Sequence, residues 1–342
     1  MGRPMNIRDV AAAAGVSVAT VSRVISPKSA DQPIRPQTRQ RVLDAIDKLG
    51  YRPNDLARAL LHQRTSAVGL VVPDISNPYY PALVRGVEDT ASTRGYRVVL
   101  CNTDRNVQKT TAYLDTLVKT RVDGIIIAGG STTMPMLRDV LQPYRTKVVV
   151  VGRHRLEFPS VRVDNVAAVR DAVEYLIGLG HRRIGFIAGP LSSNTVQDRL
   201  EGYRQALRAA GVESPDELVR EGDFQEQSGY DIARSLPDWP VRPTALVAAN
   251  DRMAVGAMAA LADAGLRVPD DVSLVGFDDV SLASYIRPAL TTVSVPTYEM
   301  GQAAMEMLLE EFDEDAGGSL PDSRVLPTRL VVRDSCAEVP RP

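Results

Sequence analysis

The sequence is poor in the residues from which metal sites and many catalytic sites are built. Its 342 residues include three histidines (His62, His154 and His181) and two cysteines, Cys101 and Cys336. None of the histidines is spaced from Cys, Asp or Glu as metal ligands are, and two distant cysteines do not make a disulfide framework. Neither common Gly-rich phosphate-binding pattern occurs. We therefore expect no catalytic residue, no metal and no cofactor, and a buried thiol at Cys101.

Long apolar runs are missing as well. No run approaches the ~20 residues that a membrane-spanning helix needs, and the first ten residues, MGRPMNIRDV, lack the apolar centre of a secretory signal. With 44% apolar and 24% charged residues, the chain has the composition of a globular protein with room for two or three cores. We expect a cytoplasmic protein with no membrane partner.

Negative charge is scarce in one part of the chain, residues 1–64. This segment has eleven Lys and Arg, five Asp and no Glu, which gives it a formal charge of +6. The rest of the chain has 29 Lys and Arg against 37 Asp and Glu, so the total of −2 conceals a strong asymmetry. A basic segment attached to an acidic body indicates a module that binds a polyanion such as nucleic acid.

Residues 1–50 are predicted to form a small head of three helices. Ile7, Val10, Ala11 and Ala14 recur at helical spacing and make one apolar face, with Asn6 as a plausible N-cap. A second helix follows the tight turn at residues 15–17, and a third runs from residue 36 to the glycine at residue 50 and buries Val42, Ile46 and Leu49. Two helices joined by so short a turn form a helix-turn-helix pattern.

The rest of the chain divides at about residue 65. Residues 51–65 contain one short helical stretch, below the ~12–15 residues at which isolated helices become marginally stable, so we expect it to order only when something buries it. From residue 66, short apolar runs alternate with amphipathic helices at 79–94, 165–179, 196–210 and 251–264. The runs are 68–72, 98–101, 124–128 and 148–151, then 184–188, 246–249 and 273–277, with a weaker one near residue 218 and a last one at 329–332.

This alternation predicts an α/β body, residues 66–342, with doubly wound parallel sheets. Roughly eight strands in two series indicate two lobes with a cleft between them. Ligands bind such sheets at the carboxyl ends of the strands.

The segment from Asn6 to Ile25 closely resembles the DNA-binding head of the lactose-repressor (LacI/GalR) family. In that family the second helix enters the major groove. The resemblance implies base contacts by Val18, Ala19 and Arg23 and phosphate contacts by Thr20 and Ser22. Arginine can bind guanine through two hydrogen bonds, while valine and alanine offer only apolar contact.

Residues 51–60 resemble the hinge helix of the same family. There the paired hinge helices of a dimer enter the minor groove, and one leucine from each opens a central base step. The matching leucine is Leu60; Ala57 permits close approach, and Asn54 caps the helix. The alternative is a flexible linker with an isolated leucine.

The resemblance extends over the whole chain, and the family's body resembles a periplasmic sugar-binding protein. It implies an effector site formed by Tyr79, Tyr80, Arg199, Phe224, Asn250 and Asp278. Aromatic rings suit the C–H face of a polyol, and Arg, Asn and Asp suit its hydroxyls. The alternative for any one of them is a loop cap or a core aromatic. Arg199 and Asp278 are expected to face a solvent-filled cleft, so their replacement by alanine should not affect folding.

The first lobe departs from the family pattern. Ala128 and Gly152 end its third and fourth strands, where relatives that bind neutral sugars often have polar residues. Polar contacts should therefore come mainly from the second lobe, which favours a small or partly apolar effector.

The sequence thus predicts a transcriptional repressor, not an enzyme, whose affinity for operator DNA is controlled by a small molecule, a sugar or related metabolite, bound between the lobes. The expected partners are a palindromic double-stranded operator and a second copy of the chain, and the expected location is the bacterial nucleoid. The alternatives are the solute-binding protein of a transporter and a sugar-processing enzyme. The missing signal sequence weighs against the first, and the lack of an acid–base pair against the second. A partner protein in place of a small effector also stays open.

Overall fold

The computed structural model describes residues 5–25, 34–51, 65–129, 134–141, 146–152, 158–213, 216–313 and 323–339. The chain divides into two compact units, a head of residues 1–65 and a body of residues 66–342, and each is described by itself.

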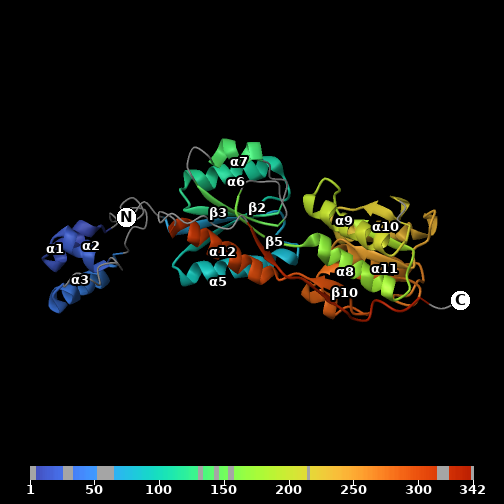
Figure 1. The fold of residues 1–342 in the computed structure, drawn as a ribbon. Helices are drawn as coiled ribbons and strands as arrows, with labels where there is room; N and C mark the ends of the chain where they lie inside the picture. Colours follow the sequence, from blue (N-terminus) through green and yellow to red (C-terminus); the bar gives the residue numbers. More distant parts are fainter. Residues whose placement is uncertain are drawn as a thin grey trace. The chain divides into compact units, whose positions relative to one another are not determined.

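The head contains three described helices, α1 (Ile7–Ala14), α2 (Val18–Ile25) and α3 (Pro36–Leu49) (Figure 1). Helix α1 begins with a capping box. The Asn6 side chain accepts hydrogen bonds from the backbone N–H groups of Arg8 and Asp9, and the Asp9 carboxylate accepts one from the Asn6 N–H. These bonds satisfy N–H groups that have no partner inside the helix, so the predicted N-cap at Asn6 is confirmed.

The core of the head is small and consists of short side chains. It is formed by Val10, Ala11, Ala14, Val21, Val24, Val42 and Ala45. Ile46 and Leu49, predicted with Val42 as the buried face of the third helix, are partly buried at the margin of this core. Three short helices thus share one core.

Within the described part of the body, twelve strands form two six-stranded sheets. The first sheet has the order β11-β5-β4-β3-β1-β2 and consists of β1 (Ala67–Val72), β2 (Arg97–Asn102), β3 (Gly124–Ala128), β4 (Lys147–Val151), β5 (Ser160–Val163) and β11 (Ser323–Leu326). The second has the order β12-β10-β9-β8-β6-β7 and consists of β6 (Ile184–Ala188), β7 (Val219–Glu221), β8 (Ala245–Ala248), β9 (Ser273–Asp278), β10 (Thr291–Ser294) and β12 (Arg329–Val331). All pairs are parallel except β10 with β12.

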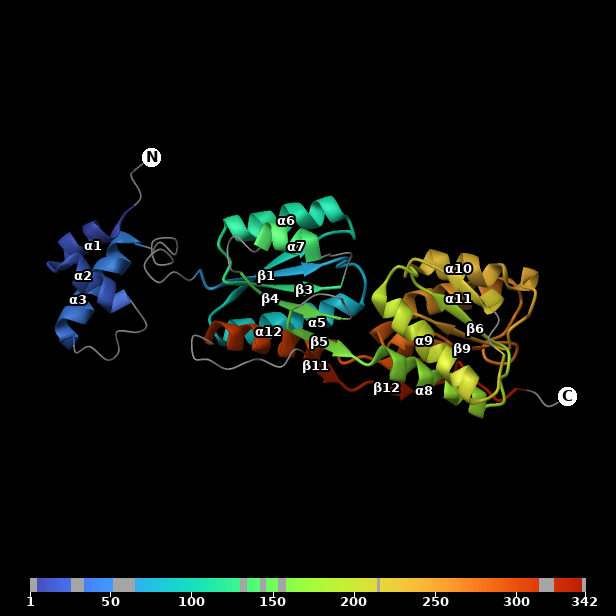
Figure 2. The same ribbon diagram turned by 45° about the horizontal axis from the view of Figure 1, so that its top comes forward.

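Helices cover both faces of each sheet (Figure 2). The first sheet lies between α6 (Val107–Lys119) with α7 (Met134–Leu141) and α5 (Tyr79–Thr93) with α12 (Thr297–Asp313). The second lies between α8 (Asn165–Gly178) with α9 (Asn194–Ala209) and α10 (Glu226–Arg234) with α11 (Asp251–Asp263). Among the described residues, short 3-10 helices occur at Asp216–Leu218, Leu236–Asp238 and Ser281–Ser284.

The chain passes between the two lobes three times: between β5 and α8, between β10 and α12, and between β11 and β12. The C-terminal elements α12 and β11 therefore complete the first lobe. The α/β class and the two doubly wound lobes are confirmed, but β5, β10 and β11 had not been predicted. Each has only four residues and mixes polar with apolar side chains, so none shows a readable period.

Helix α12 is held against α5 at very close range. A Cβ added at Gly86 would lie 2.1 Å from the Tyr298 carbonyl oxygen, and one added at Gly301 would lie 2.2 Å from the Leu83 carbonyl oxygen. Two glycines thus let the backbones touch, and the returning helix becomes part of the first lobe's core. No helix among the described residues combines the length and apolarity needed to cross a bilayer.

Candidate functional site

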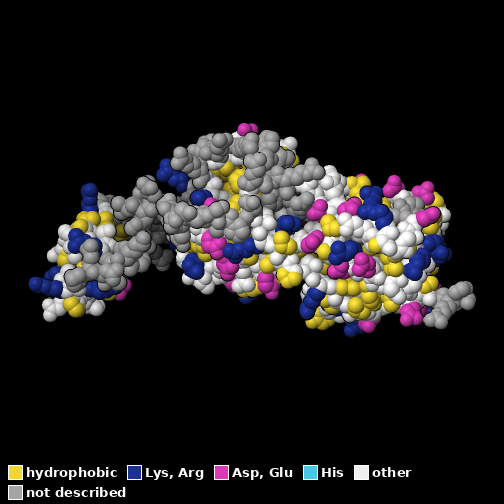
Figure 3. All heavy atoms as spheres, in the orientation of Figure 1, with side chains coloured by type: hydrophobic (Ala, Val, Ile, Leu, Met, Phe, Trp, Pro, Cys, Tyr) yellow, Lys and Arg dark blue, Asp and Glu magenta, His cyan; other side chains and the backbone are white. Residues whose placement is uncertain are grey.

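Helix α2 presents one exposed face. Val18, Ala19, Ser22 and Arg23 are exposed, with Val18 at 40%, whereas Val21 on the other side is fully buried. Four of the five α2 residues predicted to contact DNA therefore lie on a single outward face. In Figure 3 the head shows mainly Lys and Arg among its charged side chains, whereas both signs are mixed over the body.

Thr20, the fifth predicted residue, has a local role at the start of α2. Its hydroxyl lies 2.9 Å from the Ser17 hydroxyl, and its N–H donates to the Ser17 Oγ at 3.1 Å. Ser17 therefore caps α2, and Thr20 supports that cap. The predicted hinge contacts Asn54, Ala57 and Leu60 lie outside the described residues.

Arg199, on α9, is buried in the second lobe and not solvent-facing as predicted. Only 6% of its surface is exposed. Its Nε donates to the Asn165 side-chain oxygen at 2.9 Å, its Nη1 donates to the Ala249 carbonyl, and its guanidinium lies 3.5 Å from the centroid of the Phe277 ring. Burial lowers the pKa of Arg199, an effect opposed by the charge of Asp278. This side chain therefore ties α8, α9 and the end of β8 together.

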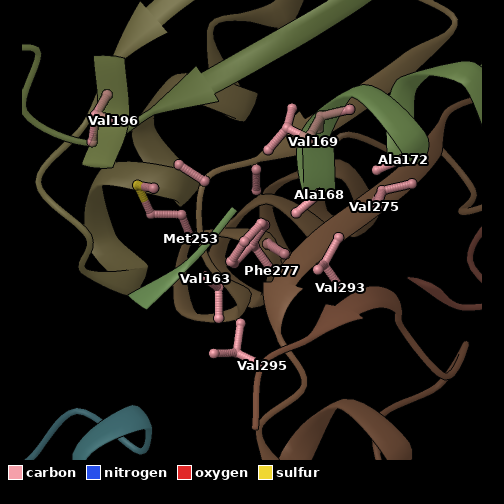
Figure 4. Packing of buried hydrophobic residues seen from close by; sticks show 14 of the residues in the cluster. Val163, Ala168, Val169, Ala172, Val196, Met253, Val275, Phe277, Val293 and Val295 are labelled. Atoms are coloured by element: carbon pink, nitrogen blue, oxygen red, sulfur yellow. The ribbon is translucent and has the colours of Figure 1, made fainter. Parts of the chain in front are cut away.

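The side chains packed around the Phe277 ring, over which Arg199 lies, are apolar. Figure 4 shows Phe277 of β9 among Met253 of α11, Val163 and Val293, which come from different elements. Phe277 is 1% exposed and belongs to the main core. The Arg199 guanidinium is therefore in a low-dielectric environment, where its electrostatic interactions are stronger than in water.

Asp278, the last residue of β9, is largely buried, and its carboxylate accepts no hydrogen bond from the described residues. It is 8% exposed, and in the described part of the chain no group donates a hydrogen bond to its carboxylate. Burial raises the pKa of Asp278 well above its ordinary value; the charge of Asp251 adds to this, and Arg199 opposes it. A buried carboxylate in this position is stabilised by any ligand that supplies O–H or N–H donors.

Asn250 and Phe224 are linked to each other. The Asn250 Oδ1 caps α11 by accepting the Met253 N–H at 3.0 Å, and its amide donates to the Phe224 carbonyl at 3.0 Å. Phe224 has a left-handed backbone with φ 69°, and its ring packs on Gly189, where a Cβ would lie 2.4 Å away. Asn250 therefore holds the loop that presents the Phe224 ring.

Tyr79 and Tyr80, at the start of α5, are the aromatic residues that the first lobe was predicted to supply to the effector site. Their rings meet edge to face, with centroids 5.1 Å apart. Burial raises the pKa of Tyr79, the charge of Asp278 raises it further, and Arg199 lowers it. Tyr79 thus shares its electrostatic surroundings with the two charged residues of the second lobe. The predicted aromatic pair therefore lies within electrostatic range of the predicted charged pair.

The sequence reasoning missed several charged residues at the edge of this site. Arg252 donates to the Glu226 carboxylate at 2.6 and 2.7 Å and lies 3.4 Å from the Asp74 carboxylate of the first lobe. Arg105 of the first lobe lies 5.1 Å from the Phe224 ring centroid. These partners are far apart in sequence, and no local pattern marks them. Among the described residues no group of His, Cys, Asp and Glu is arranged to hold a metal ion.

An exposed helix-turn-helix face and a two-lobed body with charged and aromatic residues buried at strand and helix ends define a DNA-binding regulator with a ligand-binding domain. Residues 6–54 match the model described as bacterial regulatory proteins, lacI family, and residues 173–336 match the periplasmic binding protein-like domain. The chain belongs to the LacI family of bacterial transcriptional regulators.

The ribose operon repressor of Escherichia coli (strain K12) is 40% identical over 311 residues, which cover 90% of this chain and 93% of that protein. The structure of a transcriptional regulator CelR–cellobiose complex is 36% identical, with a TM-score of 0.73, and the match covers 97% of this chain and 100% of that one. The lac repressor dimer bound to operator and the anti-inducer ONPF is 29% identical, with a TM-score of 0.87 and coverage of 98% and 100%.

Proposed function

We propose that this chain is a homodimeric repressor that binds a palindromic operator. A small carbohydrate that binds between the lobes lowers or raises the affinity of the repressor for that operator. The observation that carries the effector site is Asp278, which is only 8% exposed. Its carboxylate accepts no hydrogen bond among the described residues, and its oxygens keep some contact with solvent, since no fully buried side-chain oxygen in that part of the chain lacks a partner. The hydroxyl groups of a sugar supply hydrogen-bond donors to such a carboxylate, and Arg199 nearby supplies the opposite charge.

The DNA contacts follow from the outward face of α2. Arg23 reads a base edge through its guanidinium, Val18 and Ala19 offer apolar contact, and Ser22 contacts phosphate. Asn54, Ala57 and Leu60 act in the hinge. One small head buries too little surface for specific binding, so two heads on a two-fold symmetric site are needed. Operator binding places the protein at the nucleoid.

Exposed apolar side chains on the body are suited to contact a second copy of the chain in a dimer. Leu100, on the edge strand β2, is 43% exposed, and Tyr285, after the 3-10 helix at Ser281–Ser284, is 75% exposed. An open sheet edge with apolar side chains is a liability unless it is covered. A dimer that buries both places removes this liability and sets the distance between the two heads.

The aromatic and polar groups of the cleft suit a small sugar. Phe224 and Tyr79 offer ring surface to C–H groups, while Asp278 and Arg199 bind hydroxyls. Ala128 ends β3 and Gly152 directly follows β4, and neither offers a polar side chain. A monosaccharide therefore fits better than a fully hydroxylated disaccharide. No step of this function requires catalysis, and we propose that the protein is not an enzyme.

Control requires that the effector prefer one arrangement of the lobes. A ligand with equal affinity for both arrangements shifts nothing, however tightly it binds. We therefore expect the effector to change operator affinity by the ratio of its affinities for the two arrangements.

The test is a thermal-shift screen of the full-length protein with D-ribose, cellobiose, nucleosides and phosphorylated sugars, because a ligand of the native state must raise the melting temperature. Positive ligands are then added to an operator titration. A change in operator affinity that is lost in Asp278→Asn supports the proposal. If Asp278→Asn responds like the parent, the effector site lies elsewhere.

A further inference from the structure

The carboxylate of Asp251 joins three elements that surround Asp278. Asp251 is the first residue of α11 and is fully buried. One of its oxygens accepts a hydrogen bond from the Thr292 hydroxyl of β10 at 2.6 Å. The other accepts the N–H of Val280, in the loop after β9, at 2.8 Å. A single side chain therefore connects the start of α11, the strand β10 and the loop that follows Asp278.

Gly276 makes this connection possible. It lies on β9, and its register partner on β10 is Thr292. A Cβ at position 276 would lie 2.2 Å from the Asp251 Oδ1, well inside the contact distance of two heavy atoms. Because glycine leaves this space open, the carboxylate passes over β9 to reach β10.

The loop that Asp251 holds has an unusual backbone. Asp278 has φ 118° and Asp279 has φ 59°, values that residues other than glycine rarely adopt. Such a conformation persists only where the surroundings determine it. Asp279 is held by an ion pair of 2.6 Å with Arg333, and the next residue, Val280, is held by Asp251. Without the second anchor the loop is free to relax, and Asp278 turns with it.

We infer that Asp251 is a positioning residue of the effector site: through Val280 and Thr292 it holds the Asp278 carboxylate in the direction in which it receives the effector's hydroxyl groups. The inference rests on the proposed function, because it assigns Asp278 to the effector. Asp251 itself touches no effector in this scheme.

Four variants of the full-length protein separate positioning from a merely structural role. Asp251→Ala removes both hydrogen bonds, and Thr292→Val removes one. Asp251→Asn keeps both, because its amide oxygen accepts from Val280 and its amide N–H donates to the Thr292 hydroxyl, which accepts as well as donates. Thr110→Val is the matched control, since Thr110 is also a buried threonine, bonded to the Asn106 carbonyl at 2.8 Å on α6.

The first measurement needs no effector. Amide hydrogen exchange of residues 278–280 should be about tenfold faster in Thr292→Val, as expected for the loss of one hydrogen bond, and faster still in Asp251→Ala, which loses both. Asp251→Asn and Thr110→Val should exchange there like the parent. If Asp251→Ala does not fold, Thr292→Val decides. Parent-like exchange in Thr292→Val overturns the inference.

The second measurement is D-ribose affinity by calorimetry. We expect a loss of about tenfold in Thr292→Val, as for one hydrogen bond, a larger loss in Asp251→Ala, which lacks both bonds, and recovery in Asp251→Asn. An Asn variant as impaired as the Ala variant overturns the inference, as does undiminished affinity in Thr292→Val. If the parent binds neither D-ribose nor cellobiose, the proposed effector class fails, and the exchange rates still decide the role of Asp251.

Discussion

Replacement of Arg199 by alanine should destabilise the body as well as remove an effector contact. The change leaves the Asn165 side-chain oxygen and the Ala249 carbonyl without the donor they have in the parent. It also removes the guanidinium from the Phe277 ring and deprives Asp278 of its nearby positive charge.

The magnitude follows from these losses. Removal of one partner from a buried charged network costs about 3–5 kcal/mol, because hydrogen bonds to a charged donor are worth about 1.5–3 kcal/mol each and part of this is offset by relief of desolvation. At about 2–4 °C per kcal/mol for a domain of this size, the body should melt about 10 °C lower.

The assay is differential scanning calorimetry of the full-length protein at pH 7. Arg85→Ala is the matched control, since Arg85 is 77% exposed and its pair with Asp89 spans 3.7 Å, an arrangement worth less than about 1 kcal/mol. If Arg199→Ala and Arg85→Ala have the same melting temperature, the buried network does not stabilise the body and the argument fails.

Asp278→Asn should bind D-ribose at least about tenfold more weakly, a loss of about 1.4 kcal/mol or more, and should melt at a lower temperature because buried Arg199 loses its opposing charge; calorimetry measures both, and parent-like affinity would contradict it. Arg23→Ala should cost about 1–3 kcal/mol at one base pair and relax preference there, which a binding-site selection detects; an unchanged preference would show that Arg23 reads no base. Burial raises the pKa of Asp251 to about 7 from an ordinary value of 3.8, so the native state holds a proton there that the unfolded chain has lost, and stability should fall as the pH rises from about 4 to about 7. Asp251→Asn should lack this contribution, and equal slopes of melting temperature against pH in parent and variant would refute it.

The sequence by itself determined the local structure of the head. The apolar spacing of α1, its capping box at Asn6 and the serine cap of α2 depend on residues within a few positions of one another, and such interactions are readable in one dimension. The longer strands could be predicted for a similar reason, since β1 and β6 are buried on both faces and appear as short apolar runs.

The tertiary structure alone decided which polar residues are buried and what they hold. Arg199 looked like a cleft-facing side chain, and only the packing of α8 and α9 shows that it is enclosed. Asp251 carried no signal, because its partner Thr292 is 41 positions away and the glycine that opens the passage lies on a third element. No pattern in the sequence predicts that α12 and β11 return to the first lobe. Burial and long-range pairing depend on elements that meet only when the chain has folded, so no local pattern of residues records them.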